Sequence, residues 1–358
     1  MIKAAFFAPM KHPNHPVPSG DRAMARALLE ALAAAEIDAE LASTVQLRDG
    51  QGSAARQAEL TKIAQAEVVR LLSVGRRKGW RLWITYHSYY KAPDLIGPAV
   101  ARGLEIPYIQ IEATRARKRL TGQWAAFAQA AEDATDAAAA VFYLTRQDEE
   151  ALRAYGPPTQ RLVHLRPFLA QSDLPPMTTG TAGMLCVGMF RTGDKLASYQ
   201  LIADTLSLLQ SADWRLDIVG DGPERPAVEA LMAPFGDKVH FCGALDPADV
   251  GDAYGKARLL FWPGVNEAFG MTYLEAQAAG VPVVAQDRPG VRDVLAPASA
   301  YPLPEAGAKG LAARIDLLMS TPKLTHYLGA QARKYVARNH MLDSALDTLR
   351  HAIDEVLS

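Results

Sequence analysis

Short apolar runs alternate with helix-length amphipathic segments along almost the whole chain, and this alternation is the strongest constraint on its fold. The expected strands cover residues 3–8, 81–85, 108–111, 140–144, 184–187, 215–219, 239–242, 259–262 and 282–285. The first of the helices between them is expected over residues 21–35. Apolar strands separated by helices form parallel sheets, because each parallel connection needs a crossover. The sequence therefore predicts doubly wound, Rossmann-like α/β architecture.

Residues 169–183 interrupt the alternation with several Pro, Gly, Ser and Thr residues and no periodicity, as is typical of a linker. A chain of 358 residues is long enough for two domains. We therefore expect one domain over residues 1–168 and a second over residues 184–340, facing each other across a cleft. Ligands of such folds bind beyond the carboxyl ends of the strands.

Composition excludes several classes of protein. Hydrophobic residues make up 49% and charged residues 22% of the chain, which is typical of a folded globular protein. The net charge of -1 and the lack of a nucleic-acid motif argue against nucleic-acid binding. Two cysteines, both in expected strands, make a disulfide framework improbable and favour a cytoplasmic location. No segment has the roughly 20 apolar residues of a membrane span, and the N-terminus reads as a strand rather than a signal peptide.

Glu267 and Glu275 form the most informative pair of charged residues. They enclose a run that leads into a helix, which ends at Gly280 before an apolar strand. A gap of eight residues is slightly more than two helical turns, so both carboxylates are expected on one helical face. Taken singly, each could be an ordinary helix carboxylate.

The helix entry between these glutamates is expected to bind an anion. The entry consists of Phe269, Gly270, Met271 and Thr272. Free N–H groups and the positive end of the helix dipole attract negative charge there, and glycine permits close approach of a ligand to the backbone.

Two further loops follow expected strands of the second half. The first holds Arg191 and Lys195, which suit a diphosphate, although a solvated basic loop is the simpler explanation. The second is the turn that begins at Gly220, which lacks the third glycine of a dinucleotide fingerprint and so argues against an NAD-linked dehydrogenase.

These segments resemble the retaining glycosyltransferases of family 4, which have the two-domain GT-B fold. The resemblance covers most of the chain and is sharpest over residues 184–290. It implies that Glu267 contacts hydroxyls of the donor sugar and that Glu275 binds the ribose. It also implies that Arg191 and Lys195 bind the diphosphate, and that the loop at Gly243 and Ala244 lies beside the nucleotide base, with Gly220 nearby.

The resemblance further implies a reaction and a separate role for each domain. The second domain would bind a UDP- or GDP-sugar, and the first would hold the acceptor hydroxyl. No metal is expected to be essential, and no cofactor is expected apart from the donor substrate. The helix expected over residues 341–358 would cross back and complete the first domain, as in other GT-B enzymes.

The first half offers less specific candidates. Ser19 and Gly20 form a small turn that could approach a phosphate or cap a helix. His87 and Tyr89 follow one expected strand, which makes His87 a candidate for catalysis and Tyr89 for acceptor binding.

Glu112 follows the next strand, where related enzymes often have a histidine, and could bind an acceptor or pair with Arg115, itself a candidate acceptor contact. His12 and His15 lack a third ligand, so no metal site is expected.

Residues 1–170 hold 22 basic and 17 acidic residues, a net charge of +5. The basic runs at residues 76–81 and 115–119 are either solvated helix faces or contacts for an anionic membrane surface, which leaves a peripheral location on the inner face of the membrane open. Two other functions remain open: a GT-B sugar-nucleotide epimerase, and a protein that binds a nucleotide sugar without turnover.

Overall fold

The computed structural model describes residues 1–17 and 19–358, and its backbone divides into two compact units. One unit contains Met1–Arg166 together with Leu342–Ser358, and the other contains Pro167–Met341. Residues 169–183, expected as a linker, lie in the second unit and bond to it, since the backbone N–H of Ala182 donates to the carbonyl of Lys256.

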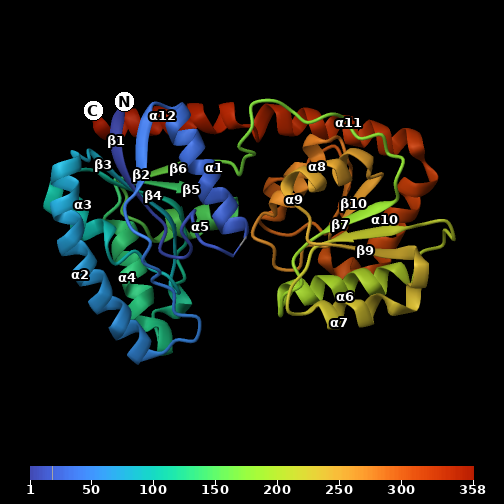
Figure 1. Cartoon of the computed structure of the whole chain (residues 1–358), viewed down its shortest axis with the longest axis horizontal. Coiled ribbons are helices and arrows are strands. Elements are labelled where there is room, and N and C mark those ends of the chain that lie inside the picture. The colour runs from blue at the N-terminus through green and yellow to red at the C-terminus, as the bar shows by residue number, and fades with distance from the viewer. Residues whose placement is uncertain (18) are drawn as a thin grey trace. The chain divides into compact units, whose positions relative to one another are not determined.

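The first unit is a parallel six-stranded sheet in the order β2-β1-β3-β4-β5-β6. Its strands are β1 (Ile2–Phe7), β2 (Ile37–Leu41), β3 (Leu82–Ser88), β4 (Tyr108–Ala113), β5 (Ala140–Tyr143) and β6 (Arg161–His164). Its helices are α1 (Gly20–Ala34), α2 (Ala54–Lys78), α3 (Gly97–Leu104), α4 (Ala125–Asp136), α5 (Arg146–Tyr155) and α12 (Leu342–Leu357), with 3-10 turns η1 (Arg117–Arg119) and η2 (Gly122–Trp124). Figure 1 shows α2, α3 and α4 on one side of this sheet and α1 with α12 on the other.

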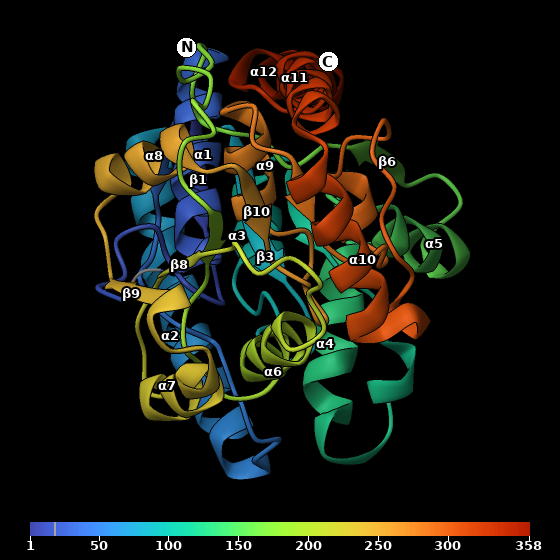
Figure 2. The same cartoon turned by 90° about the vertical axis from the view of Figure 1, so that its right-hand side faces the viewer.

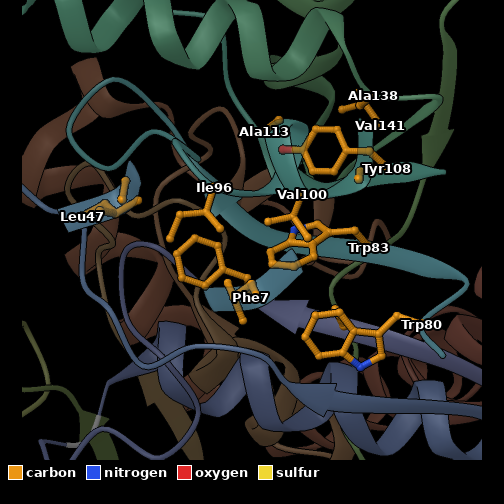
Figure 3. Close-up of a cluster of buried hydrophobic side chains, with 14 of the residues drawn as sticks. Phe7, Leu47, Trp80, Trp83, Ile96, Val100, Tyr108, Ala113, Ala138 and Val141 are labelled. Atoms are coloured by element: carbon orange, nitrogen blue, oxygen red, sulfur yellow. The ribbon is translucent and has the colours of Figure 1, made fainter. Parts of the chain in front are cut away.

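One face of this sheet buries a large aromatic cluster. Phe7 and Trp83 project from neighbouring strands and are fully buried, with their ring centroids 6.3 Å apart (Figure 3). Val100 of α3 and Tyr108 at the start of β4 pack on the same cluster. Because burial of an aromatic or aliphatic side chain contributes about 1.5–3 kcal/mol, this cluster fixes the sheet and therefore the positions of the loops that follow its strands.

Helix α1 illustrates how local sequence sets an element. The Ser19 side chain accepts a hydrogen bond from the backbone N–H of Arg22 at 3.2 Å and so caps the helix. Met24, Leu28 and Leu32 recur at a spacing of four and are fully buried. The helix packs beside α12, so the C-terminal helix belongs to the first unit.

The second unit is a parallel five-stranded sheet in the order β11-β10-β7-β8-β9. Its strands are β7 (Met184–Val187), β8 (Leu216–Val219), β9 (Val239–Gly243), β10 (Leu259–Phe261) and β11 (Val283–Val284). Its helices are α6 (Asp194–Leu206), α7 (Arg225–Met232), α8 (Pro247–Lys256), α9 (Met271–Ala278), α10 (Gly307–Ser320) and α11 (Pro322–Asn339), with 3-10 turns η3 (Ala233–Lys238), η4 (Val291–Asp293) and η5 (Pro304–Ala306). Figure 1 shows α6 and α7 along one face of this sheet and α8 and α9 along the other.

The two predicted parallel sheets are confirmed, and each predicted strand overlaps an observed one. Strands β2 and β6 were not predicted. Both lie at the edges of the first sheet, where a strand needs less apolar sequence. Within the described residues, no helix is both long enough and apolar enough to span a membrane.

Candidate functional site

A lysine and a glutamate 72 residues apart in the sequence form an ion pair in the second unit. Lys195 is the second residue of α6, directly after the loop that follows β7, and Glu267 lies in the segment between β10 and α9. The Lys195 Nζ lies 2.5 Å from the Glu267 Oε2. Strands β7 and β10 are neighbours in the sheet, so their carboxyl ends bring these two residues together.

The fully buried side chain of Trp262 holds this pair in place. Its indole N–H donates to the Glu267 Oε2 at 3.1 Å, and the Lys195 Nζ lies 4.9 Å from the ring centroid. The side chains of Lys195 and Glu267 are 32% and 18% exposed, so the pair is held in place and a ligand can still reach it. Sequence analysis placed Trp262 inside a strand and missed this role, because the strand ends one residue earlier, at Phe261.

The backbone before α9 takes a tight path that aims the Glu267 side chain. Asn266 has a φ of 47°, and its amide donates to the Asp194 side chain at 2.8 Å. The backbone N–H of Val265 donates to the Ser198 hydroxyl at 3.1 Å. The expectation that Glu267 and Glu275 share a helical face is wrong, because α9 begins at Met271 and Glu267 lies four residues before it. The turn, rather than the helical period, positions the first carboxylate.

The start of α9 keeps the features of an anion site. Gly270 adopts a φ of 78°, and a Cβ there would lie 2.7 Å from the Tyr273 ring, so the tight approach requires glycine. No side chain caps the helix, which leaves its first N–H groups available. The Thr272 hydroxyl is buried without a hydrogen-bond partner. Phe269 and Met271 flank this entry, as expected from the sequence.

Glu275 lies on α9 and receives a hydrogen bond that the sequence did not reveal. The Tyr254 hydroxyl of α8 donates to the Glu275 Oε2 at 3.0 Å. Burial raises the pKa of the Glu275 carboxyl, while the hydrogen bond from Tyr254 partly opposes this rise. Tyr254 thus orients a carboxylate that would otherwise be poorly stabilised.

The other predicted residues of this unit lie on loops with different roles. A Cβ on Gly220 would lie 1.9 Å from the Gly188 carbonyl oxygen, so this glycine lets the loops after β7 and β8 pack against each other. Gly243 has a φ of 73° and open space around it, and Ala244 beside it is exposed. Arg191 is exposed on the loop before α6.

The first unit gathers a second group of titratable residues at the ends of β3 and β4. The His87 Nδ1 lies 2.9 Å from the Asp21 Oδ1 of α1 and 3.7 Å from the Glu112 Oε2. His87 and Glu112 have φ values of 57° and 59°, which side-chain-bearing residues seldom adopt. Such strain persists where the surroundings enforce it, often at functional sites.

Electrostatic coupling within this group is strong. Burial lowers the pKa of His87, but the Glu112 and Asp21 carboxylates outweigh it and raise the pKa to about 9. Burial raises the pKa of Glu112 to about 7, although His87 opposes the rise. Burial also opposes ionisation of Asp21, yet its contact with His87 lowers its pKa. The group can therefore hold or release a proton near neutral pH. The sequence did not single out Asp21.

Tyr89 extends this group, since its ring centroid lies 5.1 Å from that of His87.

The remaining predicted residues of the first unit have other surroundings. Ser19 caps α1, and Gly20 beside it has open space around its Cα. Arg115 is buried and forms ion pairs with Glu132 and Asp136 of α4 rather than with Glu112.

That burial of Arg115 overturns the expectation that residues 115–119 form a solvated helix face as a whole. Arg117 and Arg119 of this run instead lie over the rings of Tyr155 and Tyr90, with guanidinium-to-centroid distances of 5.0 and 5.2 Å.

Comparisons with known proteins bear on the family and the fold of this chain. Residues 193–335 match the family model described as "Glycosyl transferases group 1". A GDP-mannose-dependent alpha-mannosyltransferase of Mycolicibacterium smegmatis is 39% identical over 85 residues, 24% of this chain and 22% of that protein. The alpha-D-kanosaminyltransferase of Streptomyces kanamyceticus is 23% identical over 76% of this chain and 74% of its own length.

Solved structures share the whole fold. The sucrose-phosphate synthase of Thermosynechococcus elongatus superposes with a TM-score of 0.77 at 18% identity, covering 99% of both chains. HepE of Anabaena, solved in complex with UDP, gives a TM-score of 0.75 at 13% identity over 99% of this chain and 100% of that one. Both matches show the fold alone. The chain therefore has the two parallel-sheet domains of the GT-B fold, and its residues 193–335 match the glycosyl transferases group 1 family model.

Proposed function

We propose that this protein is a retaining glycosyltransferase that moves a hexose-type sugar from a UDP- or GDP-sugar to an acceptor hydroxyl. The observation that carries the proposal is the Lys195–Glu267 pair held by Trp262 beside the uncapped start of α9. The similarity to a GDP-mannose-dependent mannosyltransferase supports a nucleotide-sugar donor.

The second unit would provide groups for the diphosphate, the sugar and the ribose of such a donor. Lys195, with Arg191 and the N–H groups of α9, would stabilise the departing diphosphate. Glu267 would accept hydrogen bonds from sugar hydroxyls, and Glu275, oriented by Tyr254, would accept them from the ribose. The ion pair with Glu267 keeps the Lys195 ammonium at a fixed point, so little reorganisation is needed when charge develops on the leaving group.

The reaction would proceed on one face of the sugar. The bond between the anomeric carbon and the diphosphate oxygen breaks, the acceptor oxygen bonds to the same face, and the acceptor proton passes to the leaving diphosphate. Because the departing diphosphate takes the acceptor proton, the step needs no separate base. Because Lys195, Arg191 and the N–H groups of α9 would stabilise the charge of the diphosphate, the proposal assigns no essential metal. The His87 and Glu112 group of the first unit would bind the acceptor, with Tyr89 as a stacking surface.

The first test is a thermal-shift panel of UDP, GDP, ADP, dTDP and their common sugars, without metal and then with Mg²⁺. A ligand at 100 times its Kd adds about 2.7 kcal/mol of stability, which gives a clear shift. We expect UDP or GDP compounds to stabilise the protein without metal. Glu275→Gln should reduce the shift, whereas Glu305→Gln in η5 should leave it unchanged.

Product analysis then separates the related functions. NMR of the product with an acceptor should show the anomeric configuration of the donor, which a retaining transferase preserves. Conversion of the donor without any acceptor would identify an epimerase instead. Binding without turnover for a broad set of acceptors would favour a nucleotide-sugar-binding protein, and a silent panel would contradict the proposal.

A further inference from the structure

Strands β8 and β9 bring together three side chains that have no part in the proposed transfer site. Asp217 lies on β8 and is paired in register with His240 on β9, while Cys242 lies two residues further along β9. Figure 2 shows these two strands side by side. Strand β9 is at the edge of the sheet, and the His240 side chain is 63% exposed. The group is therefore reachable from solvent.

A local irregularity in the strand pairing aims Cys242 toward this group. The register shifts between Ile218 and Val219, so that Val219 pairs with Gly243 and Cys242 is the extra residue of a bulge. Bulges re-aim side chains and are treated as designed features of a sheet. Here the Cys242 Sγ lies 3.5 Å from the His240 Nδ1, and the Asp217 Oδ1 lies 3.4 Å from the same nitrogen.

These separations equal the edges of a tetrahedral metal centre. With Zn–S of about 2.3 Å and Zn–N and Zn–O of about 2.0–2.1 Å, tetrahedral angles give N···S of about 3.6 Å and N···O of about 3.4 Å. All three donor atoms lie within 4.8 Å of one another. The two separations from the His240 Nδ1 therefore match two edges of such a centre, and the Asp217 and Cys242 donor atoms lie within 4.8 Å of each other.

The chemistry of the donors matches a borderline-soft divalent cation. Thiolate and imidazole ligands select zinc and its first-row neighbours over Mg²⁺ or Ca²⁺. A carboxylate and a thiolate would together neutralise the charge of such an ion. A bound divalent cation favours the deprotonated thiol, so Cys242 would ligate as the thiolate.

We propose that Asp217, His240 and Cys242 form a binding site for one Zn²⁺-type ion, with a water molecule at the fourth position. The ion would join β8 to the edge strand β9. Such a joint would stabilise the second unit without entering the sugar-transfer chemistry. The sequence alone predicted no metal site, because Asp217 lies on a different strand from the other two ligands and only the sheet brings them together.

The test is a titration of the metal-free full-length protein with Co²⁺, which reports thiolate ligation through a charge-transfer band in the near ultraviolet. We expect one such band that saturates at a single equivalent and is displaced by Zn²⁺. Cys242→Ser should abolish the band and His240→Gln should weaken Co²⁺ binding by more than about tenfold, as expected for loss of a ligand. His351→Gln, at another exposed histidine, is the matched control and should change nothing.

Further outcomes test the assignment independently of transferase activity. Binding should weaken as the pH falls, since protons compete for the thiolate and the imidazole. Zn²⁺ should raise the Tm of the wild-type protein and of Glu275→Gln equally, but not that of Asp217→Asn. A cobalt band that survives Cys242→Ser would come from Cys186 and would overturn the proposal, as would the absence of any band in the wild type.

Discussion

The coupling between His87 and Glu112 leads to a quantitative prediction for Glu112→Gln. Opposite unit charges 3.7 Å apart attract by about 4 kcal/mol at an effective dielectric constant of about 20, equal to about three pKa units. Glutamine keeps the volume of the side chain and removes its charge, while Asp21 stays 2.9 Å from the imidazole. We therefore expect the pKa of His87 to fall from about 9 by about one to three units.

An NMR titration of protein with labelled histidines measures this change, with His87→Gln used to assign the resonance. Asp148→Asn is the matched control, because Asp148 is the weakest of the charges that raise the pKa of His87. The control should lower that pKa by much less than Glu112→Gln does. An unchanged pKa in Glu112→Gln would refute the coupling, and equal effects of the two substitutions would refute its assignment to the contact with Glu112.

The same coupling sets a window of pH for stability. The pKa of His87 in the folded protein, about 9, exceeds its ordinary value of 6.5. Folding therefore favours the imidazolium, and this contribution to the free energy of unfolding is fully present below a pH of about 6.5 and is lost as the pH rises through about 9. Urea unfolding over this range should show a shallower loss of stability in Glu112→Gln than in the wild type.

Three further substitutions test the second unit. Lys195→Ala should reduce kcat by about 10²-fold or more, because it removes a positive charge from the developing leaving group, and steady-state kinetics with the identified donor will measure this. Tyr254→Phe removes the hydrogen bond to Glu275 at 3.0 Å and should weaken donor binding by about 1 kcal/mol in calorimetry. Gly220→Ala would place a Cβ 1.9 Å from a backbone carbonyl oxygen and should lower the free energy of unfolding by about 2 kcal/mol or more. Gly251→Ala, where a Cβ meets nothing within 4 Å, should leave stability equal or higher in the same urea experiment.

The sequence predicted the sheets because their central strands are buried on both faces and therefore appear as apolar runs. Strands β2 and β6 were not predicted, because they lack such an apolar run. The β2 sequence, Ile37–Leu41, carries acidic residues at alternate positions, and β6, Arg161–His164, begins and ends with basic ones. Edge strands have only one neighbour to pack against, so their composition carries less information about their structure.

The candidate site was predictable where a residue lies in a segment that resembles the family, as Glu267, Glu275 and Lys195 do. Glu267 and Glu275 are close in sequence, so their spacing was visible even though the helix begins later than that spacing suggested. Trp262 and Tyr254 act through contacts with these carboxylates from other elements. Nothing in the local sequence of a tryptophan or a tyrosine distinguishes such a contact from ordinary core packing.

Backbone strain provides evidence about the site that no sequence pattern contained. Five non-glycine residues in the described part of the chain have positive φ values. Glu36 and Glu105 lie at the ends of α1 and α3, where left-handed residues commonly terminate helices. His87, Glu112 and Asn266 have no such explanation, since the first two are the penultimate residues of β3 and β4 and Asn266 lies between β10 and α9. Each left-handed residue costs on the order of 1 kcal/mol of conformational free energy. In this protein the strained residues hold a titratable group, or the turn that carries Glu267, at the carboxyl end of a sheet. That is where parallel α/β folds bind their ligands, so we propose that the strain in both units serves the candidate sites.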